Sequence, residues 1–532
     1  MKVISIYGGH NATVVFNTNE KYHIVELERL MKQRYFMLFD KTPEEFTRII
    51  NLTLDIAKKY WGIENDFDIC TYGVNGANHV NYIKNVINTK QIKQFNHHLS
   101  HAACAYYQSS RPVSSTYNFE KQPNDIIISF DGGGNDGVFN VYSADRKSIN
   151  PNPIFSSNLN LGHAYMLTGY PISELKGQKG GLPHDLALAG KMMGLAAYGK
   201  IREEWISPML RFYQSTGVWS LQYLGQEIGL SLGINTLQGQ ASFDFAATSQ
   251  KVFEILALDL INKVVEKTKP DFVCLSGGCA LNVLLNEKLA REYGWGDDFL
   301  FIPPNSDDGG LALGQHFLVT QPTSPVDVTF NGLPILDKDK FSFYISTRKN
   351  RKISFAEFAK YLKQGKIVGI IEGDSEVGPR ALGNRSIVCD PSFENMKNIL
   401  NAKVKFREWF RPFAPVALDD EANTFFVLNQ KTLNNHRFMS FAPIVRDQYQ
   451  NQLKSITHED GSSRLQTVSK NENSVFSNLL NEFSKIDNKP AVLLNTSFNI
   501  KGLPILSTYE DAFKVLDETE LDAVYTNGYL FE

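Results

Sequence analysis

Cysteine is scarce in this sequence. Five cysteines occur among 532 residues, an odd number at scattered positions: Cys70, Cys104, Cys274, Cys279 and Cys389. Such a set argues against a disulfide framework and favours a reducing compartment, so we expect a cytoplasmic protein. Cys274 and Cys279 could share a metal ion, but two thiols without a second pair are more often residues of a hydrophobic core.

Long hydrophobic runs and a strong net charge are also lacking. No uninterrupted apolar stretch approaches the ~20 residues that a membrane-spanning helix needs, and the first nine residues predict a buried strand, not a signal peptide. The formal net charge is -3, so the surface as a whole should not attract nucleic acid or anionic membranes. We therefore expect neither as a partner, although a local basic pocket stays compatible with this charge.

The length of the chain predicts more than one domain. With 532 residues it is too long for one hydrophobic core, because cores stop growing at roughly 250 to 300 residues. The stretch 321–351 is rich in Pro, Thr, Ser and Lys and lacks a strong helical period, which suits a connection between modules. We place the boundary near residue 340, which predicts a first module, 1–340, and a second module, 341–532.

A strand, a glycine turn and a second strand occur twice in the first module. Residues 4–15 can be laid without gaps on residues 128–139. Glycine lets backbone amides approach a ligand closely, so two such hairpins facing each other could clamp the phosphates of a nucleotide. Two ordinary hairpins would have the same sequence pattern. Residues 276–282 form another glycine turn after an apolar strand, for which a nucleotide contact and a simple tight turn are equally good interpretations.

The helices have recognisable starts. Thr42-Pro43-Glu44-Glu45 combines an N-cap, a proline at the first helical position and a capping-box glutamate, and Ser354 with Glu357 repeats the capping box. Gly365 follows the second helix, and residues 366–371 then predict a buried strand. Helices and strands alternate in this way, which predicts an α/β protein.

Two histidines, His97 and His101, have the spacing of metal ligands. They lie four residues apart, so on a helix both imidazoles project from one face. Asp307 and Asp308 lie in a glycine-bearing turn before a predicted helix and could supply a carboxylate, although either residue could simply cap that helix. Two histidines and one carboxylate would leave open positions on a divalent ion for a substrate.

The second module concentrates cations among glycine, proline and aromatic residues. Segments 378–386 and 405–413 contain four arginines and a lysine: Arg380, Arg385, Lys405, Arg407 and Arg411. A partly buried set of this kind needs an anionic partner, and the planar fork of arginine suits phosphate or carboxylate oxygens. Glu408 could neutralise one cation internally. Arg464 and the polar run 495–499 could complete an anion site, although each is weak evidence alone.

Taken together and in this order, the motifs resemble the O-carbamoyltransferase family of nodulation-factor and antibiotic tailoring enzymes, the NodU and CmcH group. The resemblance extends from His10 to Asn499 and rests on five segments: 97–102, 191–199, 378–386, 405–415 and 495–499. It implies an N-terminal domain of duplicated ASKHA type, the actin-like ATPase fold, similar to the universal tRNA threonylcarbamoyl-adenosine transferase. It also implies a smaller, YrdC-like α/β domain at the C-terminus.

The resemblance further implies two linked reactions. In the C-terminal domain, carbamoyl phosphate would lose phosphate and the carbamate would be adenylated by ATP, which Mg²⁺ would accompany. In the N-terminal domain, the carbamoyl adenylate would react with a hydroxyl group of a small-molecule acceptor. A sugar, a nucleoside, a secondary metabolite and a hydroxymethylated nucleotide all stay open as acceptors, and a homodimer stays open as the assembly.

Carried over residue by residue, the family's metal ligands fall on His97, His101 and Asp308, and its catalytic base falls on His10. Iron(II) is the first choice because two histidines and one carboxylate with open positions suit it, while zinc or another divalent ion stays open. A histidine can accept the proton of the acceptor hydroxyl at neutral pH. Asn11 follows His10 where the family usually has aspartate, which is a departure beside the base.

The family's remaining contacts fall on both modules. Its carbamoyl phosphate contacts fall on six residues of the second module: Arg380, Lys405, Arg411, Arg464, Asn495 and Ser497. Its nucleotide segments fall on six residues of the first module: Gly132, Gly133, Lys191, Gly277, Gly278 and Asn282. Because cationic groups neutralise phosphate charge during transfer, the first set agrees with the anion site inferred from the residues alone.

Three other functions stay open. A different ATP-dependent acyl or phosphoryl transferase could share the scaffold, since ASKHA folds also include sugar kinases, but a kinase would not need the arginine-rich second module. A catalytically silent binding protein would not be expected to keep the histidines, the aspartate and the cations together. A tRNA threonylcarbamoyl transferase would be expected to have a basic RNA-binding surface, which the composition does not indicate.

Overall fold

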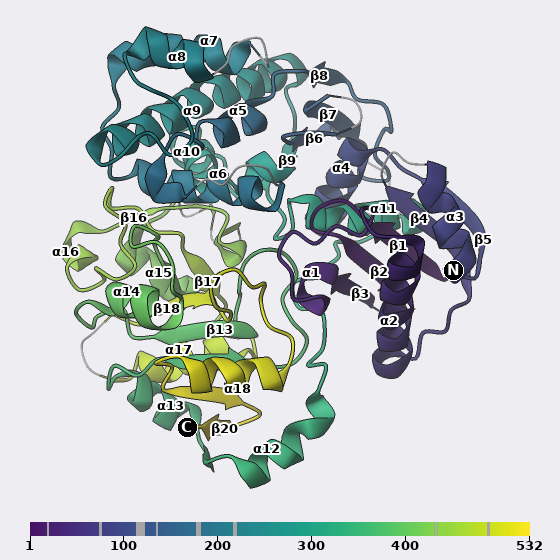
Figure 1. Cartoon of the computed structure of the whole chain (residues 1–532), viewed down its shortest axis with the longest axis vertical. Coiled ribbons are helices and arrows are strands. Elements are labelled where there is room, and N and C mark those ends of the chain that lie inside the picture. The colour runs from purple at the N-terminus through teal and green to yellow at the C-terminus, as the bar shows by residue number, and fades with distance from the viewer. Residues whose placement is uncertain are drawn as a thin grey trace.

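The structure of the chain is a computed structural model with three main β-sheets and helices packed against them (Figure 1). It describes the chain except for nine short segments or single residues: 19–20, 74–76, 113–122, 135–136, 177–181, 216–220, 430, 433–434 and 487–489. All five cysteines are buried and unbridged, as their spacing predicts. Among the described residues, no helix is both long and apolar enough to cross a bilayer.

The first sheet has five strands in the order β3-β2-β1-β4-β5. The strands are β1 (Val3–Tyr7), β2 (Thr13–Asn17), β3 (Tyr22–Glu26), β4 (Phe67–Gly73) and β5 (Thr89–Gln94). The capping box predicted at Thr42 and Glu45 is present and opens α2 (Pro43–Trp61). Phe46 and Ile50 of this helix pack with the apolar side chains of β1 and β2, so the amphipathic pattern fixes how the helix lies on the sheet.

The second sheet repeats the topology of the first, in the order β10-β9-β6-β7-β8. Its strands are β6 (Asp125–Phe130), β7 (Phe139–Ala144), β8 (Phe155–Ser157), β9 (Phe272–Ser276) and β10 (Leu300–Phe301). β6 pairs antiparallel with β7 and parallel with β9, just as β1 pairs with β2 and β4. The repeated hairpin predicted from the sequence is therefore confirmed, apart from residues 135 and 136, which lie outside the described residues.

Two helices pack against each other between these sheets. α11 (Leu311–Thr320) contacts β1, β2 and β4, while α4 (His97–Gln108) contacts β6 and β9. The helices approach closely at Gly314, where an added Cβ would lie 1.8 Å from the carbonyl oxygen of Ser100. The N-termini of both helices therefore lie near the carboxyl ends of β1 and β6, where the two sheets face each other.

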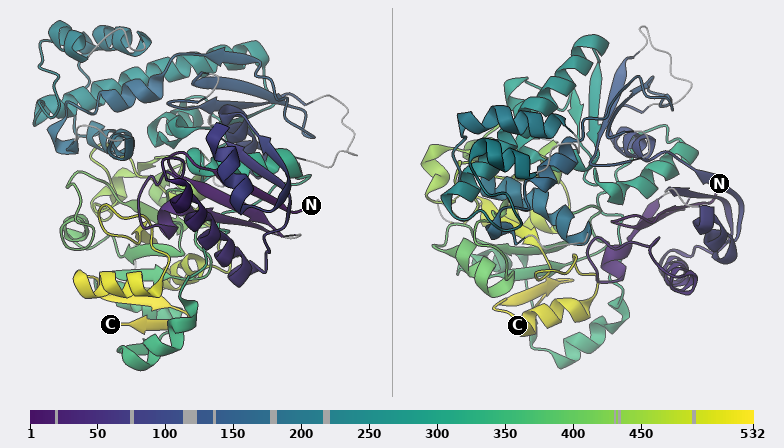
Figure 2. Two further views of the ribbon diagram at one scale, coloured as in Figure 1. Left: turned by 45° about the vertical axis from the view of Figure 1, so that its right-hand side comes forward. Right: turned by 45° about the horizontal axis from the view of Figure 1, so that its top comes forward.

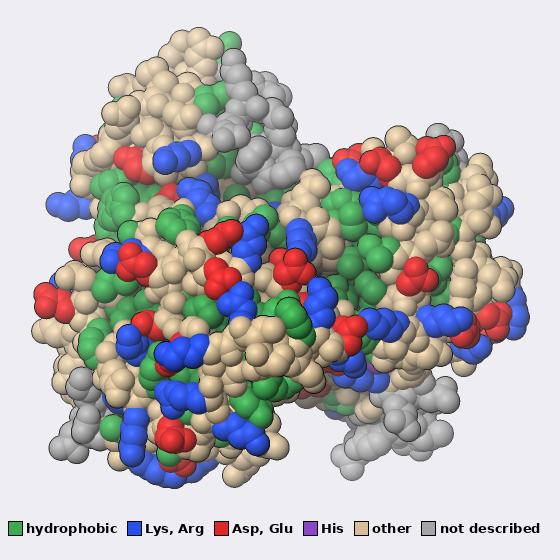
Figure 3. Space-filling view, turned by 60° about the horizontal axis from the view of Figure 1, so that its bottom comes forward, with side chains coloured by type: hydrophobic (Ala, Val, Ile, Leu, Met, Phe, Trp, Pro, Cys, Tyr) green, Lys and Arg blue, Asp and Glu red, His purple; other side chains and the backbone are tan. Residues whose placement is uncertain are grey.

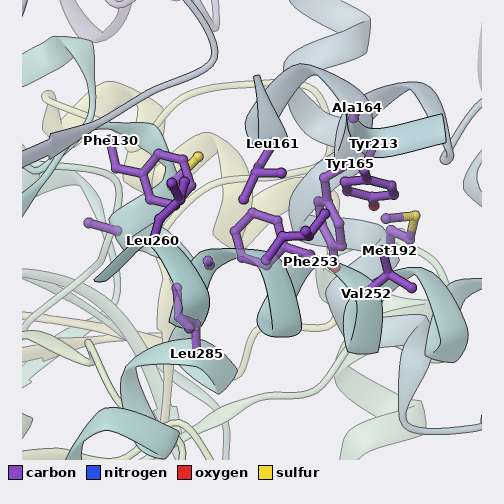
Figure 4. Packing of buried hydrophobic residues seen from close by; sticks show 14 of the residues in the cluster. Phe130, Leu161, Ala164, Tyr165, Met192, Tyr213, Val252, Phe253, Leu260 and Leu285 are labelled. Atoms are coloured by element: carbon purple, nitrogen blue, oxygen red, sulfur yellow. The ribbon is translucent and has the colours of Figure 1, made fainter. Parts of the chain in front are cut away.

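A layer of helices covers the other face of the second sheet (Figure 1). It contains α5 (Leu161–Leu167), α6 (Leu182–Ala196), α7 (Glu203–Gln214), α8 (Leu221–Ile228), α9 (Gln240–Thr268) and α10 (Val283–Glu292). Figure 4 shows how Phe130 of β6 and Phe253 and Leu260 of α9 meet in its core. α9 is buried over most of its length, which agrees with its weak separation of polar and apolar faces.

The third sheet has eight strands, in the order β11-β20-β19-β12-β13-β18-β14-β17. The strands are β11 (Asn350–Lys352), β12 (Val368–Ile371), β13 (Arg385–Cys389), β14 (Ala414–Leu418), β17 (Gln466–Val468), β18 (Val492–Ser497), β19 (Ala523–Thr526) and β20 (Tyr529–Phe531). A separate pair, β15 (Phe426–Val427) and β16 (Ile444–Val445), lies outside it.

Helices cover both faces of the third sheet. α13 (Phe355–Leu362) and α17 (Val475–Phe483) share one core with Leu493, while α15 (Asp419–Phe425) and α18 (Tyr509–Glu518) share the other with Leu494. Successive residues of a strand point to opposite faces, so buried strands here are apolar throughout. The capping box predicted at Ser354 and the strand predicted at 366–371 are both confirmed.

The connection predicted at 321–351 is more ordered than its composition indicates. It contains α12 (Phe341–Thr347), and its apolar residues Val328 and Leu333 are buried in two different cores of the first module. The third sheet consequently lies below the helical layer and beside the first sheet in Figure 1, and the views in Figure 2 agree. On the face shown in Figure 3, basic and acidic side chains are interspersed, which agrees with the small net charge.

Candidate functional site

Two histidines and two aspartates converge where the first two sheets face each other. His97 and His101 come from the first turns of α4, Asp131 follows β6, and Asp308 begins the short 3-10 helix Asp308–Gly310 before α11. Their ligand atoms all lie within 4.8 Å of one another. The Nε2 atom of His101 lies 2.8 Å from Asp131 Oδ2 and 3.4 Å from Asp308 Oδ1. The predicted pairing of His97 and His101 with a carboxylate is thus present in the geometry.

Mutual hydrogen bonding governs the charges in this cluster. Burial alone would raise the pKa of Asp131, but hydrogen bonds from His101 and His97 outweigh burial and hold it well below its ordinary value. Burial alone would lower the pKa of His101, but its hydrogen bonds to Asp131 and Asp308 raise it to about 9. Two imidazole nitrogens and two carboxylates suit a divalent transition metal such as iron, zinc or manganese.

Asp131 is the ligand that the sequence analysis missed. The gap-free repeat contains a signal for it, because Asp131 and Tyr7 occupy equivalent positions at the ends of β6 and β1. The hydroxyl of Tyr7 donates to Asp308 Oδ2, so both equivalent residues face the same cluster. A polar residue at the same strand end in both repeats therefore indicates a shared site.

The two neighbouring acids of the 307–308 turn have different roles. Asp308 lies in the cluster, whereas Asp307 Oδ1 accepts a hydrogen bond from the backbone N–H of Gly309 at 3.2 Å. Burial and the charge of Asp308 raise the pKa of Asp307 to about 6. Asp308 is therefore the candidate ligand, and Asp307 caps the turn.

His10 lies beside the cluster, in the turn between β1 and β2. Its Nε2 atom is 3.3 Å from Asp308 Oδ2, and its Nδ1 atom is 3.1 Å from Asn11 Oδ1. Burial alone would lower the pKa of His10, but Asp308 and the bond to Asn11 raise it above its ordinary value. Its side chain is 29% exposed, so it remains within reach of a substrate. Asn11 thus orients the ring without adding a charge.

A second candidate site consists of buried and partly buried cations in the second module. Four predicted contacts, Arg380, Lys405, Arg411 and Arg464, lie close enough to influence one another electrostatically, together with Arg407. Burial lowers the pKa of each side chain. Neighbouring cations lower it further, and the pKa values of Lys405, Arg407 and Arg464 lie well below their ordinary values. We call these five residues the cation cluster.

Several polar atoms at the cation cluster have no protein partner. Arg464 Nε and Asn495 Oδ1 are buried without a hydrogen bond. Lys405 Nζ instead donates to the carbonyl oxygens of Ser497, at 2.6 Å, and Asn499, at 2.7 Å. A buried donor without an acceptor is costly, so Arg464 Nε favours an anion, whereas Asn495 Oδ1 needs a hydrogen-bond donor.

Two arginines of the predicted cation motifs have structural partners. Arg385 is fully buried and donates to the carbonyl oxygens of Glu372, Asn384 and Gly373. The prediction that it gathers with the other cations is wrong, because it is the first residue of β13 and points to the loop 372–373. Arg407 donates to Asn401 Oδ1 and stacks over Phe413, although it still borders the cation cluster.

The first module also contributes to this region. Arg34 lowers the pKa of both Lys405 and Arg411, after the larger effect of burial, which places its charge near the cation cluster. Lys191 Nζ lies 3.1 Å from Glu408 Oε1, and Arg411 lies 3.6 Å from the other oxygen of Glu408. Sequence patterns missed Arg34 because nothing in its local spacing points to the second module.

Two family models match this chain. Carbamoyltransferase N-terminus matches residues 26–316, and Carbamoyltransferase C-terminus matches residues 359–532. The chain belongs to the carbamoyltransferase family.

Nodulation proteins are among the relatives of this carbamoyltransferase-family enzyme. NolNO of Sinorhizobium fredii is 31% identical over 84% of this chain and 65% of NolNO, so the chain spans just under two thirds of that relative. NolO of Bradyrhizobium diazoefficiens is 31% identical over 82% of this chain and 78% of NolO. Nodulation protein U of Sinorhizobium fredii is 31% identical over 70% of this chain and 67% of that protein.

Among solved structures, full-length HypF in the phosphate- and nucleotide-bound form is similar to this chain, and the match covers 60% of this chain and 55% of HypF. Its TM-score is 0.34 and its sequence identity is 16%, which is too distant to support an argument about fold or ligands.

The glycine turns of this carbamoyltransferase-family chain lie side by side, because they follow the parallel neighbours β6 and β9. Gly277 has a φ of +91°, and an added Cβ would lie 2.2 Å from the carbonyl oxygen of Phe130, so only glycine fits there. We call His97, His101, Asp131 and Asp308 the metal cluster. Gly132 and Gly133 border it through Asp131, while Gly278 lies beside the Asp131 carboxylate. These four predicted residues are thus brought together.

The other two predicted nucleotide contacts have partners within the protein. Asn282 caps α10 by accepting from the N–H of Leu285, and its amide group exchanges hydrogen bonds with Gln250. Lys191 faces Glu408 of the second module and also donates to the carbonyl of Leu175. The structure therefore joins Lys191 to the cation cluster and not to the glycine turns.

Proposed function

We propose that this chain is an ATP-dependent O-carbamoyltransferase that makes carbamoyl adenylate in its second module and transfers the carbamoyl group to an acceptor hydroxyl in its first module. The observation that carries the proposal is the presence, in one member of the carbamoyltransferase family, of two sites with opposite requirements. One is a histidine and aspartate cluster that suits a divalent cation, and the other is a buried cation cluster that suits a phosphorylated anion.

The division into modules follows from this proposal. The two five-stranded sheets with the same strand order support a duplicated, ASKHA-type first domain, residues 1–340. The eight-stranded sheet and its helices, within residues 341–532, would form a YrdC-like domain that holds carbamoyl phosphate and ATP with Mg²⁺. Arg380, Lys405, Arg411 and Arg464 would neutralise the phosphate charge.

The first reaction would take place at the cation cluster. Water would cleave carbamoyl phosphate into carbamate and phosphate. A carbamate oxygen would then attack the α-phosphorus of ATP, and the bond to pyrophosphate would break. Asn495 Oδ1 and Arg464 Nε, both without protein partners, are groups that could bind the carbamoyl amine and a phosphate oxygen respectively.

The second reaction would take place beside His10. The acceptor hydroxyl oxygen would attack the carbamoyl carbon, and AMP would leave with the bridging oxygen. Because Nδ1–H of His10 can donate to Asn11 Oδ1, its Nε2 atom would take the hydroxyl proton, and Asp308 at 3.3 Å would stabilise the imidazolium.

A divalent metal would complete this second site. His97, His101, Asp131 and Asp308 would hold it, and iron(II) is our first choice because mixed imidazole and carboxylate ligands with open positions suit it. When bound, the metal would supply a positive charge that polarises the carbamoyl carbonyl. The proposed acceptor is a small molecule with a hydroxyl group.

Release of pyrophosphate tests the proposal before any acceptor is known. Carbamoyl phosphate should stimulate pyrophosphate release from ATP by the purified protein. A protein with intact fold and metal that shows no stimulation would contradict the first reaction and favour a kinase or a silent binding protein.

The His10→Asn variant tests the division of labour between the two sites. It should keep carbamoyl phosphate-dependent pyrophosphate release and the wild-type metal content, but lose ~10²- to 10⁴-fold in transfer to an acceptor, because it lacks the base. Equal loss of both activities would contradict the assignment of transfer to the first module.

A further inference from the structure

We infer that Glu26 and Arg29 of the first module are positioning residues for the anion site of the second module, because they hold the backbone of residues 376–378 and thereby orient Arg380. This inference rests on the proposed function, in which Arg380 contacts carbamoyl phosphate. Neither residue lies in a segment on which the family resemblance rests.

Glu26 and Arg29 form a buried pair at the start of α1 (Leu27–Leu30), which directly follows β3. Arg29 Nε lies 2.9 Å from Glu26 Oε2, and the two side chains are 1% and 10% exposed. Glu26 ends β3 and is the N-cap of α1, while Arg29 lies within the helix, so the turn from strand to helix brings the two side chains together at the second module.

The pair binds three backbone groups of the loop 376–378, namely two carbonyl oxygens and one N–H. The two terminal nitrogens of Arg29 donate to the carbonyl oxygens of Glu376 and Gly378, both at 2.7 Å. Glu26 Oε1 accepts the N–H of Gly378 at 3.1 Å. All three nitrogen groups of Arg29 are therefore directed at the pair or the loop, which leaves the loop little freedom.

Neighbouring contacts restrict the same loop from other sides. The segment 329–332 bonds to β3 through Ile24 N–H and to the loop through Val377 N–H, both at 2.9 Å. From inside the second module, Glu376 Oε1 accepts the N–H groups of Leu382, at 2.6 Å, and Arg385, at 3.2 Å. The loop is thus held at both ends. Among the described residues of the first module, Glu26 and Arg29 bind its backbone, and Lys21 pairs with Asp374 just before it at 3.0 Å.

Gly378 brings the loop against the turn that carries Asp308. Its φ is +97°, and an added Cβ would lie 2.5 Å from the carbonyl oxygen of Pro304. Arg380 follows two residues later. Burial is the main cause that lowers its pKa to about 10, and the charges of Asp307 and Arg411 have smaller effects on it. The loop therefore lies between the metal cluster and the cation cluster, and its position decides where the Arg380 guanidinium points.

Stability alone is a weak reason for this arrangement. Replacing a buried ion pair by apolar residues of similar volume is often neutral or stabilising, because desolvation offsets the attraction between the charges. A pair that also satisfies three backbone groups at one fixed geometry is better suited to defining a conformation. A catalytic or binding group displaced by about 1 Å can lose as much as 100-fold in function.

The Arg29→Lys variant tests the inference directly. Lysine keeps the positive charge beside Glu26. Because it lacks the planar guanidinium fork of arginine, it cannot bind both carbonyl oxygens and the carboxylate at once. We expect the Kd for inorganic phosphate, measured by isothermal titration calorimetry, to rise about tenfold or more. The KM for carbamoyl phosphate in pyrophosphate release should rise in parallel, whereas metal affinity should stay at the wild-type value.

A second variant guards against misfolding of the first. Glu26→Gln keeps an oxygen for the Gly378 N–H but replaces the carboxyl group beside Arg29 by an amide, so it should give a smaller rise in the same two constants. Arg111→Lys is the matched control, because Arg111 forms a buried ion pair with Asp125 at 2.7 Å in the first module. It should lower the melting temperature without changing the Kd for phosphate.

The outcomes separate this inference from the proposed function. If phosphate affinity in Arg29→Lys and Glu26→Gln equals that of the wild type, or falls no more than in Arg111→Lys, the inference is wrong. If the wild type shows no carbamoyl phosphate-dependent pyrophosphate release, the proposed function fails, but the phosphate titration still decides the role of the pair. A wild type that binds no phosphate would overturn the inference as well.

Discussion

The metal cluster and the cation cluster differ in how their buried charges are stabilised. In the metal cluster, acids and imidazoles hydrogen-bond one another, so His101 and Asp131 gain partners without any ligand. In the cation cluster, burial and like charges lower the pKa of Arg464 together, and its Nε atom has no partner. The first site pairs opposite charges with one another, whereas the second gathers like charges, with Glu408 beside Arg411.

This difference indicates what each site contributes before it binds anything. The metal cluster can keep its geometry without a metal ion, because protonated imidazoles supply part of the positive charge that the ion would supply. In the cation cluster, like charges repel one another, and a phosphorylated substrate would relieve this repulsion on binding. Removing one residue should therefore affect ligand binding in both clusters, but affect the stability of the free protein with opposite sign.

Arg464→Met should give the largest effect. We expect a loss of roughly 10³-fold in carbamoyl phosphate-dependent pyrophosphate release, because one of the cations that neutralise phosphate charge is missing. The ligand-free protein should at the same time become more stable, since like-charge repulsion and the cost of a buried, unpaired donor disappear. Pyrophosphate assays and denaturant unfolding without phosphate would measure the two changes.

Arg348→Met is the control for this variant. Arg348 also lies in the second module, but both its terminal nitrogens pair with Asp517, at 2.9 and 2.6 Å. It should leave pyrophosphate release unchanged and make the protein slightly less stable. A destabilised Arg464→Met variant would break the comparison between the clusters.

Asp131→Asn should have the next largest effect, on metal affinity. The amide keeps the size of the side chain but removes a charge that His101 and the metal both need, so affinity should fall about 100-fold. Competition with a coloured chelator would measure it. Asp307→Asn should cause a much smaller loss, because Asp307 caps the turn and is not among the four clustered ligands; equal losses would contradict the assignment of Asp308.

Glu287→Gln should change stability only and should leave both sites unaffected. Glu287 is a buried carboxylate of α10 outside both clusters, and burial raises its pKa from 4.5 to about 7. Between these values the folded protein binds more protons than the unfolded chain, so stability falls as pH rises. The variant should remove this slope and gain up to about 3 kcal/mol at pH 8.

Unfolding measured from pH 4.5 to 8 would test this prediction. Glu292→Gln, a substitution at an exposed position of the same helix, should keep the wild-type slope. If Glu287→Gln keeps that slope too, burying an ionised carboxylate costs less free energy in this protein than the comparison between the clusters assumes.

The sequence determined the local features of this protein. Thr42 and Ser354 open helices because their capping boxes act within one turn, and His97 and His101 share a helix face because of their spacing. The repeated hairpin follows from apolar runs joined by glycine turns between strands that are close in sequence. All of these depend on interactions between residues close in sequence.

Tertiary structure alone decided which distant groups share a site. Asp131 joins His97 and His101 because β6 ends beside α4, Arg385 turns to the 372–373 loop, and Lys191 meets Glu408 across the modules. The hold of Glu26 and Arg29 on residues 376–378 joins positions about 350 residues apart in the chain. The physical reason is that charge pairing depends on distance in space, which local periodicity and spacing do not encode.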